Sequence, residues 1–283
     1  RRGEVAGREQ REEDWRIAGE MFRRAIERDP EFARARAASA YIHLRLYWYG
    51  FDRTRERVEM ARRQLDEAFE LNRDLSWAHI SEGYYQYWIE RDYDRAIERF
   101  ERGLEGLPGD AEVRSLVGFV YRRQGRLDEA IEELKKATRR DPLNGNLAEE
   151  LGNTLRGARR WEEAARFLNR AIALAPDYPS GYLRKVDLLV SWTGGVEGAR
   201  QVLREAERLV PERDLLETAV WIEILAGEPE AALERLEAYP QEMIDAQYDL
   251  HPEELLRARA LELAGRAEAA RRSYEAARRV LED

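Results

Sequence analysis

Small and large apolar residues recur along the chain at helical spacing, with charged residues between them. In residues 128–140, Ala130, Leu134 and Ala137 lie on one face of a predicted helix. Residues 111–124 form another helical segment, which ends at Gly125, and acidic Asp128 follows in the first turn of the next helix. The pattern therefore predicts two helices joined by a short turn.

This pair of predicted helices repeats with a period of 34 residues. The residues that define it return in the next copy: Gly118, Ala130, Ala137 and Pro142 become Gly152, Ala164, Ala171 and Pro176. Small residues let the two helices of a pair approach closely, and a large residue such as Leu134 fills the remaining space. A fixed period of this length predicts a stack of similar helix pairs.

Weaker copies extend the array over the whole chain. We expect one domain, residues 1–283, with approximate units at 1–32, 33–74, 75–109, 110–143, 144–177, 178–211, 212–240 and 241–283. The first unit has a short or missing first helix. In the third unit, Gly83 falls one residue out of phase with Ala96, compared with Gly118 and Ala130.

Two segments interrupt the repeat. About nine extra residues around 47–56 should lengthen both helices of the second unit or the turn between them at 50–52. Residues 240–251, with the sequence PQEMIDAQYDLH, break the phase before the last pair and are interpreted as a linker. No sheet is expected anywhere in the chain.

The repeated positions resemble the tetratricopeptide repeat; the matching residues of the clearest copy are Gly118, Tyr121, Ala130, Leu134, Ala137 and Pro142. This resemblance implies an all-α, right-handed superhelical solenoid of antiparallel helix pairs. It also implies a scaffold that binds a peptide or partner protein in a concave groove, and not an enzyme. Segments such as YRRQGRLDEAIEELKKA further resemble repeat modules of bacterial signalling proteins. We therefore expect a regulatory or sensory module of a larger bacterial protein; the alternative is an assembly or chaperone-like factor that holds a client chain.

In this family, defined positions of each first helix line the concave surface. Counted by phase, the resemblance assigns to the groove Tyr85, Trp88, Phe119, Arg122, Asn153, Arg156 and Trp221. The alternative is that these side chains cover a neighbouring helix. If Arg122 and Arg156 lie side by side next to Phe119, the groove should accept a peptide that offers carboxylates and an apolar side chain.

Composition excludes several kinds of chemistry. The chain has no cysteine and three histidines, none of which pairs with another at metal-ligand spacing, so we expect no catalytic residues, no metal and no cofactor. A net charge of −9 argues against nucleic acid as a partner. No apolar stretch approaches the length of a membrane span. We expect a soluble protein, with the cytoplasm favoured.

Two further features have open interpretations. The aromatic residues Tyr41, Tyr47, Trp48, Tyr49 and Phe51 either pack the lengthened second unit or form an exposed anchor for a partner. The incomplete repeats at the two ends should expose apolar stripes. We therefore expect end-to-end association into homo-oligomers, or a longer natural chain that covers these ends.

Overall fold

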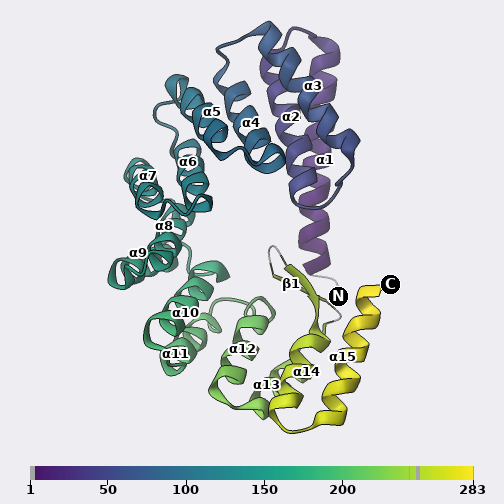
Figure 1. Ribbon diagram of the computed structural model, residues 1–283, viewed down its shortest axis with the longest axis vertical. Coiled ribbons are helices and arrows are strands. Elements are labelled where there is room, and N and C mark those ends of the chain that lie inside the picture. Colours follow the sequence, from purple (N-terminus) through teal and green to yellow (C-terminus); the bar gives the residue numbers. More distant parts are fainter. Residues whose placement is uncertain (1–3, 242, 247–248, 283) are drawn as a thin grey trace. The chain divides into compact units, whose positions relative to one another are not determined.

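The computed structural model describes residues 4–241, 243–246 and 249–282, and this part of the chain is helical almost throughout (Figure 1). Fifteen α-helices, one π-helical turn, one 3-10 turn and two short strands make up these residues. The elements are α1 (Glu4–Arg28), α2 (Ala33–Trp48), α3 (Arg55–Leu71), α4 (Ser76–Tyr85), η1 (Gln86–Glu90), α5 (Tyr93–Gly106), α6 (Ala111–Arg123), α7 (Leu127–Arg140), α8 (Gly145–Gly157), α9 (Trp161–Leu174), α10 (Pro179–Thr193), α11 (Glu197–Ala206), η2 (Glu212–Asp214), α12 (Leu216–Ala226), α13 (Pro229–Ala238), β1 (Met243–Ala246), β2 (Asp249–Pro252), α14 (Glu253–Leu263) and α15 (Ala267–Glu282). The all-α prediction is confirmed.

The chain divides into two compact units, between Pro142 and Leu143. The first unit contains the helix pairs α2/α3, α4/α5 and α6/α7, and α1 packs against α2. The second unit contains the pairs α8/α9, α10/α11, α12/α13 and α14/α15. In the first unit, α1 is one continuous helix of 25 residues, with no partner helix before it among the described residues. Whether residues 1–283 form one domain, and the handedness of the whole array, stay predictions.

Small residues on one helix face large residues on the other, as the repeat predicts. Ala130 and Ala164 are fully buried. A Cβ built on Gly118 would lie 2.9 Å from Cγ of Leu134, and one on Gly152 would lie 2.8 Å from Cγ of Leu168. Glycine at these positions therefore allows the two helices of the pair to lie in close contact.

Each turn inside a helix pair contains one residue in the left-handed conformation. This backbone state turns the chain at the end of the first helix, and glycine adopts it without steric cost. The seven such residues in the described ranges, one for each pair, are Gly50, Arg91, Gly125, Arg159, Gly194, Gly227 and Gly265. Arg91 and Arg159 are the two that carry a side chain.

In the third repeat, the structure corrects the predicted position of Gly83. A Cβ on Gly83 would lie 2.6 Å from the ring of Phe100, so Gly83 has the same role as Gly118 and Gly152. The chain absorbs the extra residue between Gly83 and Ala96 in the π-helical turn η1, immediately after α4. A π-turn holds one more residue than the α-helical turn it replaces. Gly83 therefore occupies the same place in its helix pair as Gly118 and Gly152, although its spacing to Ala96 is one residue longer.

The insertion in the second repeat lengthens both of its helices and the turn between them. Helices α2 and α3 have 16 and 17 residues, compared with 13 and 14 in α6 and α7. The connecting turn also widens, because α2 ends at Trp48 and α3 begins at Arg55. Both of the expected outcomes are thus present together.

The segment interpreted as a linker contains a β-hairpin, so the expectation of no sheet is wrong there. Strands β1 and β2 pair antiparallel, with Met243 opposite Pro252 and Ile244 opposite His251. Ile244 is buried against an apolar cluster that includes Val220 and Leu256. Burial of this side chain against α12 and α14 gives a short polar segment a fixed place in the second unit.

Candidate functional site

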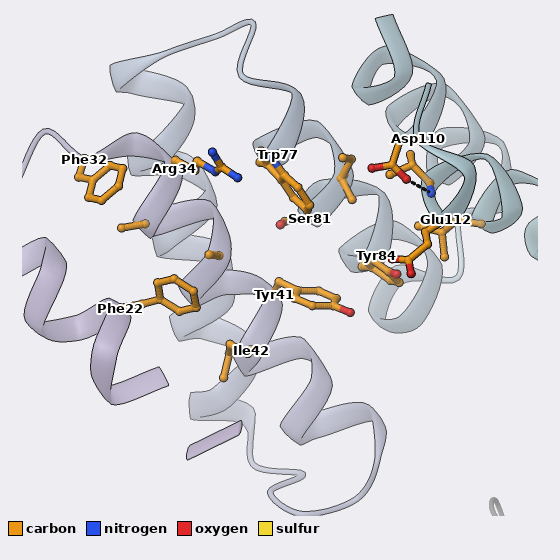
Figure 2. Close-up of a pocket in the computed structure, with 15 residues that line it drawn as sticks. Phe22, Phe32, Arg34, Tyr41, Ile42, Trp77, Ser81, Tyr84, Asp110 and Glu112 are labelled. Atoms are coloured by element: carbon orange, nitrogen blue, oxygen red, sulfur yellow. Dashed lines mark hydrogen bonds between the residues drawn. The ribbon is translucent and has the colours of Figure 1, made fainter. Parts of the chain in front are cut away.

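A largely apolar pocket lies within the first compact unit. It encloses about 480 Å³ between the first helices of three successive pairs, α2, α4 and α6, with α1 at one side. Figure 2 shows aromatic side chains from these helices around it. The lining residues are Phe22, Phe32, Arg34, Ala35, Ala38, Tyr41, Ile42, Trp77, Ile80, Ser81, Tyr84, Asp110, Glu112, Val113 and Leu116.

Two tyrosines inside the pocket are held in place by hydrogen bonds. The rings of Tyr41 and Tyr84 lie 4.9 Å apart, and a side-chain hydrogen bond joins them. Arg45 donates a further hydrogen bond to the Tyr41 hydroxyl. Burial raises the pKa of Tyr84 well above its usual value, so its hydroxyl stays protonated. The pocket is therefore preformed around fixed aromatic rings.

The rim of the pocket carries an exposed indole, one guanidinium group and two carboxylates. Trp77 is 37% exposed, and the guanidinium carbon of Arg34 lies 5.5 Å from the centre of its ring. On the α6 side, Asp110 caps the helix by accepting a hydrogen bond of 2.9 Å from the backbone N–H of Val113. Glu112 follows in the first turn of α6 and is exposed.

The predicted groove residues of the first unit have different environments. The guanidinium of Arg122 lies 5.2 Å from the ring centre of Phe119, one turn earlier on α6. Trp88 stacks on Trp48, with ring centres 5.3 Å apart and ring planes 10° from parallel. Tyr85 is only 8% exposed and packs in a buried cluster with Leu65. Tyr85 is therefore a core residue.

The phase of Gly83 explains the position of Tyr85. Phe119 directly follows Gly118, and Asn153 directly follows Gly152. The residue that directly follows Gly83 is Tyr84, which lines the pocket. Counting back from Ala96 crosses the extra residue and so selects Tyr85. Counting forward from Gly83 selects Tyr84.

In the second unit, the predicted groove residues make contacts within that unit. Arg156 donates two hydrogen bonds to Oδ1 of Asn153, at 3.0 and 3.2 Å. The guanidinium of Arg259 lies 4.9 Å from the ring centre of Trp221. Arg122 and Arg156 belong to different compact units. Their expected adjacency on one groove wall stays a prediction.

One position that is apolar on α4 is charged on α8. Glu149 lies three residues before Gly152, as Ile80 lies three residues before Gly83. Its buried carboxylate accepts a hydrogen bond of 2.5 Å from Ser180, and Arg184 lies 3.6 Å away. Burial raises the pKa of Glu149 above its usual value. The position that carries Ile80 in the pocket wall therefore carries a buried carboxylate on α8.

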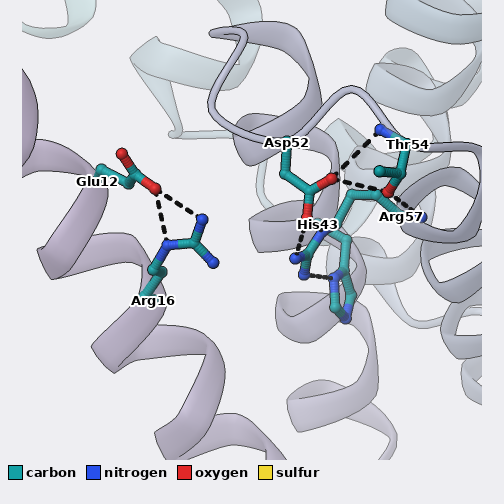
Figure 3. A network of polar contacts seen from close by, with 6 residues as sticks. All are labelled: Glu12, Arg16, His43, Asp52, Thr54 and Arg57. Carbon is teal, nitrogen blue, oxygen red and sulfur yellow. Dashed lines mark hydrogen bonds and ion pairs between the residues drawn. The ribbon is translucent and has the colours of Figure 1, made fainter.

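The histidines are part of local polar networks. Arg57 donates a hydrogen bond of 2.9 Å to Nδ1 of His43 and also contacts Asp52, as Figure 3 shows. Burial and the neighbouring guanidinium lower the pKa of His43 to about 4. His79 lies 3.0 Å from the carbonyl oxygen of Arg73, and His251 lies 3.1 Å from Glu217. Across the described ranges, no group of three or more metal-binding side chains comes together.

The aromatic cluster of the second repeat, in residues 41–51, packs mainly against its neighbours. Tyr49 and Phe51 contact the ring of Trp15 on α1, at 4.8 and 5.5 Å between ring centres. Tyr41 and Trp48 contact aromatic rings of α4 and η1. The packing interpretation is confirmed for Trp48, Tyr49 and Phe51, whereas Tyr41 also lines the pocket. No helix in the part of the chain that the structure describes is long and apolar enough to cross a membrane.

Comparison with known proteins supports the repeat assignment. Residues 87–144 and 118–179 match the family model for the tetratricopeptide repeat. Residues 87–179 therefore contain tetratricopeptide repeats, and the helix pairs of the chain adopt the all-α fold of such repeats. A fold of this kind supports a protein–protein interaction scaffold.

Solved structures share this fold at low sequence identity. PilF of Pseudomonas aeruginosa is 24% identical with a TM-score of 0.53; the match covers 73% of this chain and 94% of that one. Human IFIT1, solved with m7Gppp-AAAA, is 17% identical with a TM-score of 0.57; the match covers 95% of this chain and 68% of that one. The human protein O-mannosyl-transferase TMTC3 is 26% identical over 161 residues, which are 52% of this chain and 18% of that protein.

Proposed function

We propose that this chain is an interaction module that binds a segment of another protein, and that a bulky apolar side chain of that segment enters the pocket between α2, α4 and α6. The observation that carries the proposal is the pocket itself: about 480 Å³ of apolar space, walled by three successive first helices. Ligand sites in proteins are mostly concave and apolar and have volumes of about 300–1,000 Å³.

The walls of the pocket suit a side-chain anchor. Phe32 and Trp77 are partly exposed at its rim, and Tyr41 and Tyr84 are fixed inside it. Burial of one large apolar side chain contributes about 1.5–3 kcal/mol, and a preformed pocket avoids the cost of ordering its walls. Anchors of this kind supply most of the binding energy in many protein interfaces.

The proposal keeps part of the groove predicted from the sequence. Trp88, Phe119 and Arg122 belong to the same compact unit as the pocket and extend the candidate surface along η1 and α6. Tyr84 takes the place of Tyr85 as the aromatic residue that the third repeat contributes to the candidate surface. In this proposal the chain acts by binding and not by catalysis; its place in a bacterial signalling protein stays a prediction.

Selection of peptides on the intact chain tests the proposal. A phage-displayed library of random peptides is selected on the protein, and the enriched peptides are synthesised and measured by calorimetry. We expect enriched peptides to share a bulky apolar residue, and Trp77→Ala to weaken binding at least tenfold. Trp192→Ala on α10 is a matched control, because the two tryptophans are 37% and 39% exposed. Equal binding by both variants would overturn the proposal.

A further inference from the structure

We propose that the bound segment carries a lysine or arginine next to its apolar anchor, and that Glu112 at the α6 side of the pocket recognises this cation. The inference rests on the proposed function and adds the charge of the ligand to it. It assigns a partner with an apolar side chain followed or preceded by a basic residue. Its evidence is the charge distribution around the rim.

Glu112 differs from many acidic residues of the chain because its helix places no cation at pairing distance along the same face. Three and four residues further along the helix stand Ser115 and Leu116, where a partner arginine would be needed for a pair within the helix. Arg114 is engaged instead with Glu133, at 3.0 Å. The Glu112 carboxylate makes no ion pair with any residue in the described ranges.

A second carboxylate adds to the negative charge at this side of the pocket. One oxygen of Asp110 accepts the capping hydrogen bond from Val113. Figure 2 shows Asp110 and Glu112 together on the α6 side of the pocket. Two carboxylates at the edge of an apolar space attract a cation, because the low-polarity wall screens their field less than water does.

The cation of the rim lies on the other side. Among the described residues that line the pocket, the basic one is Arg34, and its guanidinium lies 5.5 Å from the ring centre of Trp77. Figure 2 shows Arg34 and Glu112 on different sides of the pocket. The rim therefore carries positive charge on one side and negative charge on the α6 side. A ligand with its basic residue toward α6 meets two carboxylates, whereas an acidic residue there is repelled.

The test uses three fluorescent peptides copied from one selected sequence. They differ in the one residue next to the apolar anchor that faces α6, which is lysine, alanine or glutamate. A second set carries the same three residues on the opposite side of the anchor, and comparison of the two sets shows which side of the anchor faces α6. Affinity is measured by fluorescence polarisation at low and at physiological salt. We expect the lysine peptide to bind about three- to tenfold more tightly than the alanine peptide, with a smaller difference at higher salt. We expect the glutamate peptide to bind most weakly.

Charge reversal at Glu112 identifies the residue that reads the ligand. Glu112→Lys should reverse the order of the three peptides. Glu101→Lys on α5 is the matched control, because Glu101 is exposed, does not line the pocket, and its reversal changes the net charge by the same amount. The control should leave the order unchanged.

The outcomes separate the two proposals. If all three peptides bind equally and still depend on Trp77, the inference about charge is overturned and the proposed function stands. If the order persists in Glu112→Lys, another group reads the cation and the inference is overturned. If binding does not depend on Trp77, the proposed function and this inference are both overturned.

Discussion

The ring of Phe100 lies directly against the backbone of Gly83, where a Cβ atom would come within 2.6 Å of it. This contact shows how the third helix pair keeps its close approach despite one extra residue. The same relationship joins Gly118 to Leu134 and Gly152 to Leu168. The extra residue lies in η1, after the contact, so Tyr84 follows Gly83 toward the pocket.

Two glycines of α8 should respond oppositely to alanine. A Cβ on Gly152 would lie 2.8 Å from Cγ and 3.2 Å from the backbone nitrogen of Leu168, so Gly152→Ala should cost about 1–3 kcal/mol through overpacking. Gly157 has no atom within 4 Å of the added position, so Gly157→Ala should be neutral or stabilise by up to about 1 kcal/mol. Urea unfolding measures both. A similar loss in both variants would contradict the packing described for this pair.

Glycine should stabilise the turn at Arg159. Arg159 has φ of 56°, whereas the equivalent residue of the preceding pair is Gly125, with φ of 75°. The left-handed state costs a residue with a side chain about 1–2 kcal/mol relative to glycine. Glycine avoids this cost but loses more backbone entropy on folding, so the net gain in stability is smaller. Arg159→Gly should therefore raise the free energy of unfolding by about 0.5–1 kcal/mol, and Gly125→Ala should lower it by a similar amount. Denaturant midpoints with unchanged slopes would measure this; a destabilised Arg159→Gly would contradict it.

His43 should make stability depend on pH in mildly acidic solution. Its pKa is about 4 in the folded chain, whereas the ordinary value of 6.5 applies in the unfolded chain. Between these values the unfolded chain therefore binds a proton that the folded chain does not. The contribution is fully present above pH 6.5 and is lost as the pH falls toward 4. The loss is at most about 3 kcal/mol.

Replacement of His43 by glutamine tests this pH dependence. Glutamine can accept the hydrogen bond from Arg57 without titrating, so we expect His43→Gln to flatten the curve of unfolding free energy between pH 4 and pH 6.5. Urea unfolding at a series of pH values measures the curve. An unchanged slope in the variant would show that other groups cause the dependence.

A charge at Ala164 tests the repeat phase. Ala164 is 0% exposed and lies on α9, which packs against α8 and α10. Ala164→Glu buries an unpaired carboxylate, and we expect a loss of about 3–5 kcal/mol. Hydrogen exchange should speed up in α8, α9 and α10 and stay unchanged in α2 and α3, because contacts in such arrays link neighbours. An unchanged melting temperature would show that the phase is wrong.

The periodic part of the fold was predictable from the sequence because identical spacings demand identical packing. Ala130 and Ala164 define the buried face of their helices, and both are fully buried. An inserted residue has no such constraint: it can enter a loop, a longer helix or a π-turn. Counting by fixed spacing therefore assigned Tyr85 to the groove, although Tyr85 is buried and the residue that lines the pocket is Tyr84.

The β-hairpin and the pocket depend on contacts that no local pattern contains. Strands of four residues give almost no periodic signal, and Ile244 is identified as a core residue only by its contact with α12 and α14. The pocket combines Phe22, Tyr41, Trp77 and Leu116 from four helices, which lie far apart in the sequence. Its shape follows from the packing of these helices and not from the sequence of any one of them.

Site-directed photocrosslinking tests the central claim most directly. p-Benzoylphenylalanine replaces Leu116, which lines the pocket, or Leu225 on α12, which is exposed and lies outside it. Each protein is irradiated with a peptide selected on the unmodified chain, and the attached residue is identified by mass spectrometry. The account predicts crosslinks from position 116 to the apolar anchor of the peptide and few from position 225. Crosslinks from position 225 alone, with none from 116, would contradict it.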